Sequence, residues 1–388
     1  MKNRFYCGNN PINHRITKIS ETVALINRPL QWIGSSWLGR IVSQLLEGLM
    51  ATLIKIGIRL KVVTASNDIK LASTGRSQVI WEEAERRGIA MQQLVIGERK
   101  LDVYMATLPT GKTIIFESLP IPTRRQTTAI RWMDDKMELK KRLLAAGLPV
   151  ARGGAFYSFR SMLKRFREID KPVIVKPAAG SRGRHTTTFI YTEEQLREAY
   201  TIGKQIAHKL VMEEHLFGSV YRATLIDGVL AGVLRGDPPR ITGDGVHTIK
   251  ALIDLKNKNR RKEVKPYVIG PLTEPFLARS GYTLESIISA GKTIDLSEKI
   301  GVSYGGFAAE DSPICHPEIK KILEQAGAIV NFPVIGFDFI IPDLTKNPRE
   351  QKWGIIESNS LPFIDLHHHP VEGPAINVAG MVWDLWSK

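Results

Sequence analysis

Cysteine is scarce in this sequence, and long apolar runs are missing from it. Only Cys7 and Cys315 occur among the 388 residues. They lie far apart, so we expect neither a disulfide framework nor a thiolate zinc site, and the chain suits a reducing cytoplasm. The most apolar stretch, Ile41 to Ile58, contains Glu47 and Lys55 and is shorter than the ~20 residues that a membrane-spanning helix needs. We therefore predict a cytoplasmic protein without stable membrane insertion.

Acidic residues are also in deficit. The chain has 39 Asp and Glu against 54 Lys and Arg, a formal net charge of +15. The basic excess is strongest before residue 76, and such a segment suits docking of a polyanion or contacts in a homo-oligomer. Its amphipathic stretch at 41–58 is expected to pack on the protein itself, with membrane-surface binding as the alternative. Residues 1–20 lack the apolar core of a secretory signal, so we expect none.

Length and composition predict a globular protein with more than one domain. At 388 residues the chain exceeds what one core usually supports, and 43% hydrophobic with 24% charged residues is typical of globular folds. A proline-bearing stretch at 119–122 marks the first boundary. We predict an N-terminal α/β domain over 1–125 for substrate docking or oligomerisation, a second unit over 126–211 and a third over 212–388. Strand and helix patterns alternate after the first boundary, which predicts an α+β class with sites carried on sheets.

Local patterns predict the following elements. They are helices over 77–88, 134–148 and 162–169, and strands over 101–106, 113–117, 154–158 and 173–176. The helix over 134–148 is expected to end at Gly147, since glycine most easily adopts the left-handed closing conformation.

A basic, glycine-punctuated loop follows the strand that ends at Lys176. Its central residues are Gly180, Ser181, Arg182, Gly183 and Arg184. Glycines let backbone N–H groups approach phosphate oxygens, while lysine and arginine add charge and forked donors. The pattern indicates a phosphate clamp. The alternative is an ordinary surface turn, because such loops are common on surfaces.

Three oxygen-bearing side chains lie on two apolar strands near the C-terminus. Strand alternation places Glu357 and Asn359 on one face, and Asp338 on a neighbouring strand can oppose them. Such a set suits magnesium, which takes few protein carboxylates and completes its octahedron with phosphates and water. The alternative is the outward polar face of an antiparallel sheet.

The order of these and further motifs resembles the ATP-grasp ligases, and in particular the ATP-grasp half of cyanophycin synthetases. The resemblance runs from about Ser77 to Trp386 and is densest from Lys136 onward. The matching stretches are Asp135-Lys136, Val175 to Pro177, Met212 to Gly218, Thr242 to Gly245, Gly281 to Leu284, Gly305-Gly306, His316 to Glu318, Gly336 to Asp338 and Glu357 to Asn359. The resemblance implies an ATP-grasp fold, in which two α/β subdomains grip ATP, with an additional N-terminal domain.

The resemblance also assigns a nucleotide site. Lys136 and Lys176 look like the two lysines that reach the ATP phosphates, and residues 180–185 look like the loop that closes over them. The linker that reads adenine is matched by Glu213, Glu214, His215 and Leu216.

Metal, catalytic and substrate residues follow in the same way. Asp338, Glu357 and Asn359 look like ligands of Mg²⁺, with Mn²⁺ as an alternative ion. Catalysis is assigned to Lys176, Arg184 and His367, and substrate contact to Asp365 and His367.

Two departures from the family pattern bear on ligand choice. Val220 stands where the family carries an acid for the ribose hydroxyls, and Asp365 replaces the arginine of a Pro-Gly-x-Arg-x-His pattern. We therefore expect a substrate that presents an amine or guanidinium toward Asp365. The chain ends at Lys388, without a counterpart of the Mur-ligase-like half of full cyanophycin synthetases, so we expect no two-step polymer extension from it alone.

The sequence thus predicts an enzyme that uses ATP to activate a carboxylate as an acyl phosphate and joins it to an amine. Amino acids or peptides are the expected substrates, and no DNA partner is expected. A glutathione-synthetase-like ligase or another amino-acid ligase with a different acceptor is the alternative within the fold. A basic nucleic-acid-binding protein with a decayed ATP site is the alternative from another class, and steeply salt-dependent binding would mark it.

Overall fold

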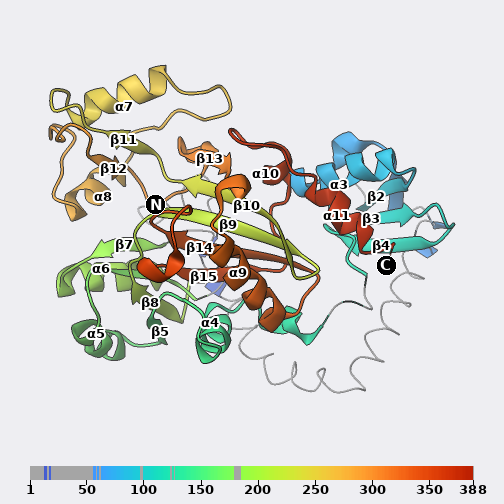
Figure 1. Cartoon of the computed structure of the whole chain (residues 1–388), viewed down its shortest axis with the longest axis horizontal. Coiled ribbons are helices and arrows are strands. Elements are labelled where there is room, and N and C mark those ends of the chain that lie inside the picture. The colour runs from blue at the N-terminus through green and yellow to red at the C-terminus, as the bar shows by residue number, and fades with distance from the viewer. Residues whose placement is uncertain are drawn as a thin grey trace.

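The computed structural model describes residues 13–14, 17–18, 56–57, 59–60, 63–96, 99–122, 125, 127–178 and 185–387. Within them the chain forms three antiparallel sheets of four or five strands and a small two-stranded sheet, with helices packed on the sheets (Figure 1). The predicted α+β class is confirmed. The amphipathic stretch predicted over 41–58 lies outside the described residues except at 56–57. The loop residues Gly180 to Arg184 all lie outside them.

The first sheet belongs to the N-terminal part of the chain and has the strand order β1-β2-β3-β4. Its strands are β1 (Val63–Ser66), β2 (Ala90–Ile96), β3 (Arg99–Thr107) and β4 (Thr113–Glu117). Helix α3 (Gly75–Arg86) crosses between β1 and β2, and the Thr74 side chain caps it by accepting from the Ser77 amide. Ile80 and Trp81 of this helix are fully buried against the sheet. The helix predicted over 77–88 and both predicted strands are confirmed.

The second sheet has the order β5-β8-β6-β7. Its strands are β5 (Gly153–Phe156), β6 (Val173–Pro177), β7 (Thr187–Ile190) and β8 (Leu210–Glu214). Helices α5 (Phe159–Glu168) and α6 (Glu193–Gly203) bury Met162 and Leu196 in a separate apolar core against these strands. Lys176 lies one residue before the end of β6, and its side chain is buried.

The third sheet is central, with the order β13-β10-β9-β14-β15. Its strands are β9 (Ser219–Ile226), β10 (Val229–Asp237), β13 (Phe307–Glu310), β14 (Val334–Ile341) and β15 (Gly354–Asn359). Helices α4 (Lys136–Ala145) and α9 (Pro317–Val330) contact each other and this sheet. Asp135 caps α4 and Gly147 follows it at φ +73°, so the predicted end of this helix is confirmed.

A smaller unit is inserted between β10 and β13, and Figure 1 shows it projecting from the central sheet. It contains β11 (Arg240–Thr242), α7 (Ile249–Lys258), α8 (Thr273–Arg279) and β12 (Thr293–Asp295). Its own apolar cluster includes Ile253 and Leu277. Short 3₁₀ turns elsewhere are η2 (Ile69–Leu71), η4 (Thr128–Arg131), η5 (Val302–Tyr304), η6 (Ser312–Ile314) and η7 (Pro348–Glu350).

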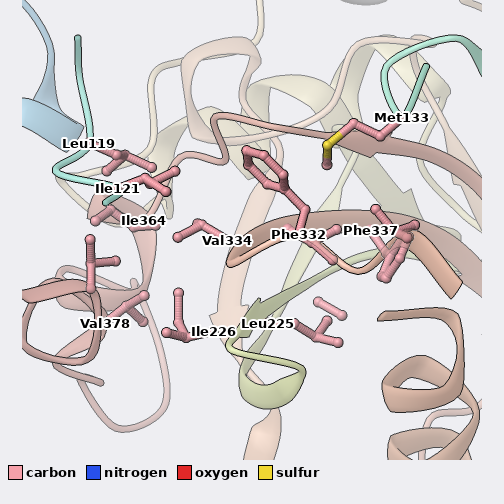
Figure 2. Close-up of a cluster of buried hydrophobic side chains, with 14 of the residues drawn as sticks. Leu119, Ile121, Met133, Leu225, Ile226, Phe332, Val334, Phe337, Ile364 and Val378 are labelled. Carbon is pink, nitrogen blue, oxygen red and sulfur yellow. The ribbon is translucent and has the colours of Figure 1, made fainter. Parts of the chain in front are cut away.

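The last helices, α10 (Asp365–His368) and α11 (Val378–Asp384), return to the N-terminal part and pack on α3 (Figure 1). The indole N–H of Trp383 donates to the Ile80 carbonyl at 3.0 Å. Figure 2 shows Ile364 and Val378 beside Leu119 and Ile121, in one apolar cluster that continues into the central sheet. None of the described helices is both long and apolar enough to cross a membrane.

Candidate active site

One buried carboxylate stands between two lysines where the second sheet meets α4. Glu213 and Lys176 lie on one face of the paired strands β8 and β6, since Glu213 pairs with Ile174, two residues before Lys176. The Lys176 Nζ lies 2.9 Å from Glu213 Oε2. Lys140, one turn along α4 from Lys136, forms a close ion pair with the other oxygen. Glu213, at 1% exposure, therefore holds both ammonium groups in place.

Burial shapes the charge state of this group. Desolvation lowers the pKa of Lys140 to about 8, opposed by Glu213 and assisted by the positive charge of Lys176. Burial would raise the pKa of Glu213, but Lys140 and Lys176 together bring it below its ordinary value. Glu213 is therefore ionised, and Lys140, with a pKa of about 8, is still mostly charged at neutral pH. Two positive charges thus face one negative charge here.

The three predicted metal ligands lie together on the central sheet. Asp338 of β14 pairs directly with Glu357 of β15, and Gly336 pairs with Asn359, so the predicted opposition of Asp338 to the face that carries Glu357 and Asn359 is confirmed. Arg222 of β9 grips Asp338 with two hydrogen bonds, both 2.7 Å long. The side chains converge because three neighbouring antiparallel strands present them on one face.

Lys136 extends this group toward the lysine pair. Its Nζ lies 3.0 Å from Glu357 Oε2. Burial would raise the pKa of Glu357, but Lys136 and Lys176 lower it to about 2. Burial also raises the pKa of Asp338, against the opposing effect of Arg222. Cations and carboxylates therefore alternate from the second sheet to the central one.

The donor set fits a magnesium ion that phosphates help to coordinate. Among the described residues, no group of three or more His, Cys, Asp or Glu could hold a metal by itself. Asp338 and Glu357 offer two carboxylates, and the buried Nδ2 of Asn359 has no hydrogen-bond partner in the described part of the chain, so this amide can turn its oxygen inward. Two carboxylates and one amide oxygen leave positions for water and phosphate, as magnesium requires.

The linker predicted to read adenine is held by ion pairs and ring contacts. Glu214 accepts from the Arg152 amide at 2.9 Å and pairs with Lys352 at 2.7 Å. His215 stacks on Phe189 with ring centroids 4.3 Å apart, and burial lowers its pKa to about 4. Leu216 is buried. Both glutamates, Glu213 included, are thus occupied by ion pairs.

The segment after β15 places the two predicted substrate residues differently. Asp365 lies against the first turn of α3, where a Cβ on Gly75 would be 2.6 Å from its Oδ2. Burial raises the pKa of Asp365, and no described group hydrogen-bonds to its Oδ1. His367 is fully buried, with Glu310 and Thr224 as its partners, so the structure puts it beneath the site surface instead of at it.

Three further residues enter the site without having been predicted. Lys140 was signalled by its i, i+4 spacing from Lys136, which puts both on one helix face. Arg222 depends on the register of β9 with β14, which no local pattern gives. Arg76 of α3 donates to the Leu361 carbonyl at 2.6 Å and joins the N-terminal part to the site.

The predicted phosphate loop is described only at its end. Gly180, Ser181, Arg182, Gly183 and Arg184 lie outside the described residues. His185, which follows them, is 1% exposed, and its Nδ1 lies 2.9 Å from the Ile202 carbonyl.

Comparisons with known proteins agree with the motifs. Cyanophycin synthetase of Crocosphaera subtropica is 29% identical over 337 residues, covering 81% of this chain and 36% of that protein. The glutathione biosynthesis bifunctional protein of Enterococcus faecalis is 31% identical over 254 residues, covering 62% of this chain and 33% of that protein. The crystal structure of a bifunctional glutathione synthetase from Pasteurella multocida has a TM-score of 0.49 at 22% identity, covering 80% of this chain and 44% of that one.

No protein-family model matches the chain. The chain spans about a third of the length of the curated relatives it matches, with 36% and 33% in the two cases above. Lys176 and Glu213 lie on the second sheet, Lys136 and Lys140 lie on α4, and Asp338, Glu357 and Asn359 lie on the central sheet. The resemblance read from the ATP-grasp motifs is confirmed: over 81% of its length this chain is similar in sequence to a cyanophycin synthetase.

Proposed function

We propose that this chain is an ADP-forming ligase that joins a carboxylate to an amine at the expense of ATP. The observation that carries the proposal is the alternating charge group of Lys140, Glu213 and Lys176 on one side and Lys136, Glu357, Asp338 and Arg222 on the other. Cations that are preorganised by buried carboxylates suit a triphosphate, whose oxygens carry the charge that phosphoryl transfer redistributes.

The residues of the chain act by positioning and by charge. Lys136 and Lys176 bind phosphate oxygens, and Lys140 adds a third cation beside them. Glu213 holds the side chains of Lys140 and Lys176 in place. Asp338, Glu357 and Asn359 would hold Mg²⁺ or Mn²⁺, which neutralises phosphate charge when it is bound. Residues 180–184, with Arg184 as a further cation, would cover the phosphates.

The chemistry proceeds in two balanced steps. A substrate carboxylate oxygen attacks the γ-phosphorus, the bond from that phosphorus to ADP breaks, and an acyl phosphate forms. The amine nitrogen then attacks the acyl carbon, the carbon–oxygen bond to phosphate breaks, and the amine loses one proton. Arg222 sits beside Asp338, where it can stabilise charge on the transferred group.

For the substrates we propose an amino acid or a peptide. Asp365 keeps one carboxylate oxygen without a described partner, which favours a substrate bearing an amine or guanidinium. Similarity to the glutathione biosynthesis protein of Enterococcus faecalis favours, as the second candidate, a glutathione-synthetase-like reaction with a different acceptor.

ADP release across mixtures of amino acids and short peptides tests the proposal. We expect release with at least one pair of substrates, and losses on the order of 100-fold or more in Lys176→Ala and Glu357→Ala. Lys346→Ala is the matched control, because this exposed lysine contacts Asp343 and no member of the charge group. Wild-type turnover in both site variants would overturn the assignment of the site.

A further inference from the structure

A buried chain of three polar side chains lies on the same face of the central sheet as the site. The His367 Nδ1 lies 2.5 Å from Glu310 Oε2, and its Nε2 lies 2.8 Å from Thr224 Oγ1. Glu310 is on β13 and Thr224 is on β9, so the imidazole lies across β10, the strand between them. The side chains of Glu310 and His367 are 0% exposed, and Thr224 is equally buried.

The sheet is shaped to accept this ring. Gly232 of β10 pairs directly with Thr224, and a Cβ on Gly232 would lie 2.6 Å from His367 Nδ1. Only glycine therefore leaves room for the imidazole at this crossing. Glu310 Oε1 accepts from the Val233 amide at 2.9 Å, which fixes the carboxylate.

The contacts among Glu310, His367 and Thr224 constrain which atoms donate and accept hydrogen bonds. Burial would raise the pKa of Glu310, but the hydrogen bond and the charge of His367 bring it below its ordinary value. An ionised Glu310 can only accept, so the Nδ1–H of His367 donates to it. The other ring nitrogen, Nε2, lies within hydrogen-bond distance of the Thr224 hydroxyl, which can either donate or accept. Each polar atom of the chain has a partner, so the chain sets the position and orientation of the ring.

His367 ends a segment that starts immediately after the predicted metal ligand Asn359. Ser360 donates from its amide and its hydroxyl to Asp134, at 2.9 and 2.7 Å. Arg76 binds the Leu361 carbonyl, and Ile364 packs in the apolar cluster of Figure 2. Residues 360–367 are therefore fastened at their start, at their middle and, through His367, at their end.

Thr224, at the other end of this chain of polar side chains, lies close in sequence to Arg222 of the proposed catalytic group. Thr224 lies two residues after Arg222 on β9, so both side chains are on the same face. Arg222 holds Asp338 by its two hydrogen bonds, and its guanidinium lies 5.6 Å from the ring of Phe363, a member of the fastened segment. A shift of residues 360–367 would therefore move the Phe363 ring relative to the Arg222 guanidinium.

We propose that Glu310, His367 and Thr224 are positioning residues that hold residues 360–367 against β9 and so set the substrate side of the site. The proposal rests on the proposed function, because it assigns the segment carrying Phe363 and Asp365 to the amino acid or peptide. His367 acts without touching substrate, through the backbone that it anchors.

Two substitutions disrupt the hydrogen bonds among Glu310, His367 and Thr224 in different ways. Thr224→Val removes the hydroxyl and keeps the shape, while Gly232→Ala pushes the imidazole away without removing any polar atom. We expect kcat/KM for the amino acid or peptide to fall on the order of 100-fold in both, as for a misplacement of about 1 Å. The Kd for the nucleotide should stay within about twofold of wild type, since the lysine group is untouched.

The controls separate positioning from loss of stability. Thr224→Ser keeps the hydroxyl and should restore kcat/KM to near the wild-type value. Thr273→Val removes another buried hydroxyl, the partner of Tyr267 in the inserted unit, and should leave kcat/KM unchanged. Amide hydrogen exchange of residues 360–369 should be about tenfold faster in Thr224→Val and Gly232→Ala, as expected for one lost buried hydrogen bond, and unchanged in both controls.

Two results would overturn the positioning role. The first is wild-type kcat/KM in both Thr224→Val and Gly232→Ala, and the second is wild-type exchange of residues 360–369 in both. If the wild-type protein itself released no ADP with any amino acid or peptide, the proposed function would fail, and the exchange measurement would still decide whether the chain anchors the segment.

Discussion

Glu213 shows how one buried residue can organise a site. Its carboxylate meets Lys140 and Lys176 at 1% exposure, so two positive charges depend on a single counter-ion. Lysine is costly to bury unpaired. The arrangement therefore stabilises the fold only while Glu213 is ionised. It also holds the two ammonium groups in place, where an anion of higher charge, such as a triphosphate, can bind them.

Replacing Glu213 by glutamine should lower the free energy of unfolding by about 3 kcal/mol, because two buried ammonium groups lose their counter-ion. Urea unfolding measures this change. Glu214→Gln is the matched control with an expected loss of about 1 kcal/mol or less, since its partner Lys352 is largely exposed. ATP should stabilise Glu213→Gln more than wild type, because phosphate restores negative charge. Equal losses in the two variants would contradict this account.

The lowered pKa of Lys140 predicts a pH dependence of nucleotide binding. The folded protein holds this pKa at about 8, below the ordinary value of 10.5. As pH rises through about 8, Lys140 loses its charge in the folded state first, so nucleotide affinity should fall, while its contribution to stability rises toward pH 10.5.

Titration of nucleotide Kd between about pH 7 and pH 9, about 1 unit to either side of this pKa, tests the prediction. Lys140→Met should bind about 10- to 100-fold more weakly at the lower pH and should lose this part of the pH dependence. Lys346→Met should behave as wild type. A wild-type Kd that does not rise over this range would argue against a titrating Lys140.

At the scale of elements, strand register makes the carboxylate group. Asp338 faces Glu357 and Arg222 because β14 pairs with β15 on one side and with β9 on the other. A shift of one residue would turn each of these side chains to the opposite face of the sheet. The close approach of the chain at the start of β9 helps to fix that register, because Gly218 lies against the end of β14.

Gly218→Ala should therefore be strongly destabilising. Gly218 has φ +123°, and a Cβ there would lie 2.2 Å from the Ile341 carbonyl oxygen. We expect a loss of about 3 kcal/mol or more in the free energy of unfolding. Gly228→Ala is the control, since Gly228 has φ +81° with open space around it and should cost only about 1 kcal/mol. Urea midpoints that do not separate the two variants would count against this contact.

At the scale of the whole molecule, the N-terminal sheet and the last helix share one core. Trp383 of α11 is buried against Phe116 of β4 and bonds to the Ile80 carbonyl of α3. Arg87 adds an ion pair with Asp384 at 2.6 Å. The N-terminal sheet is therefore completed by the last helix.

Trp383→Ala should lower the free energy of unfolding by about 3–5 kcal/mol, the usual cost of emptying a large aromatic site. Amide hydrogen exchange of residues 90–117, measured as the temperature rises, should show that the first sheet loses its protection from exchange in this variant. Trp386→Ala is the comparison, because Trp386 is only partly buried and its loss should cost less. Protection in the first sheet that survives Trp383→Ala would contradict a shared core.

Much of this protein follows from its sequence alone. Residue periodicity predicted α4 and the left-handed Gly147 that follows it, and strand alternation predicted one face for Glu357 and Asn359. The order of the motifs predicted the ligase resemblance, and each of these features depends on neighbours along the chain. Tertiary structure alone decided that Glu213 is shared by Lys140 and Lys176, that Arg222 holds Asp338, and that His367 is buried between Glu310 and Thr224. The physical reason is that these contacts join strands and helices whose pairing is set by burial of the whole core, which no local pattern encodes.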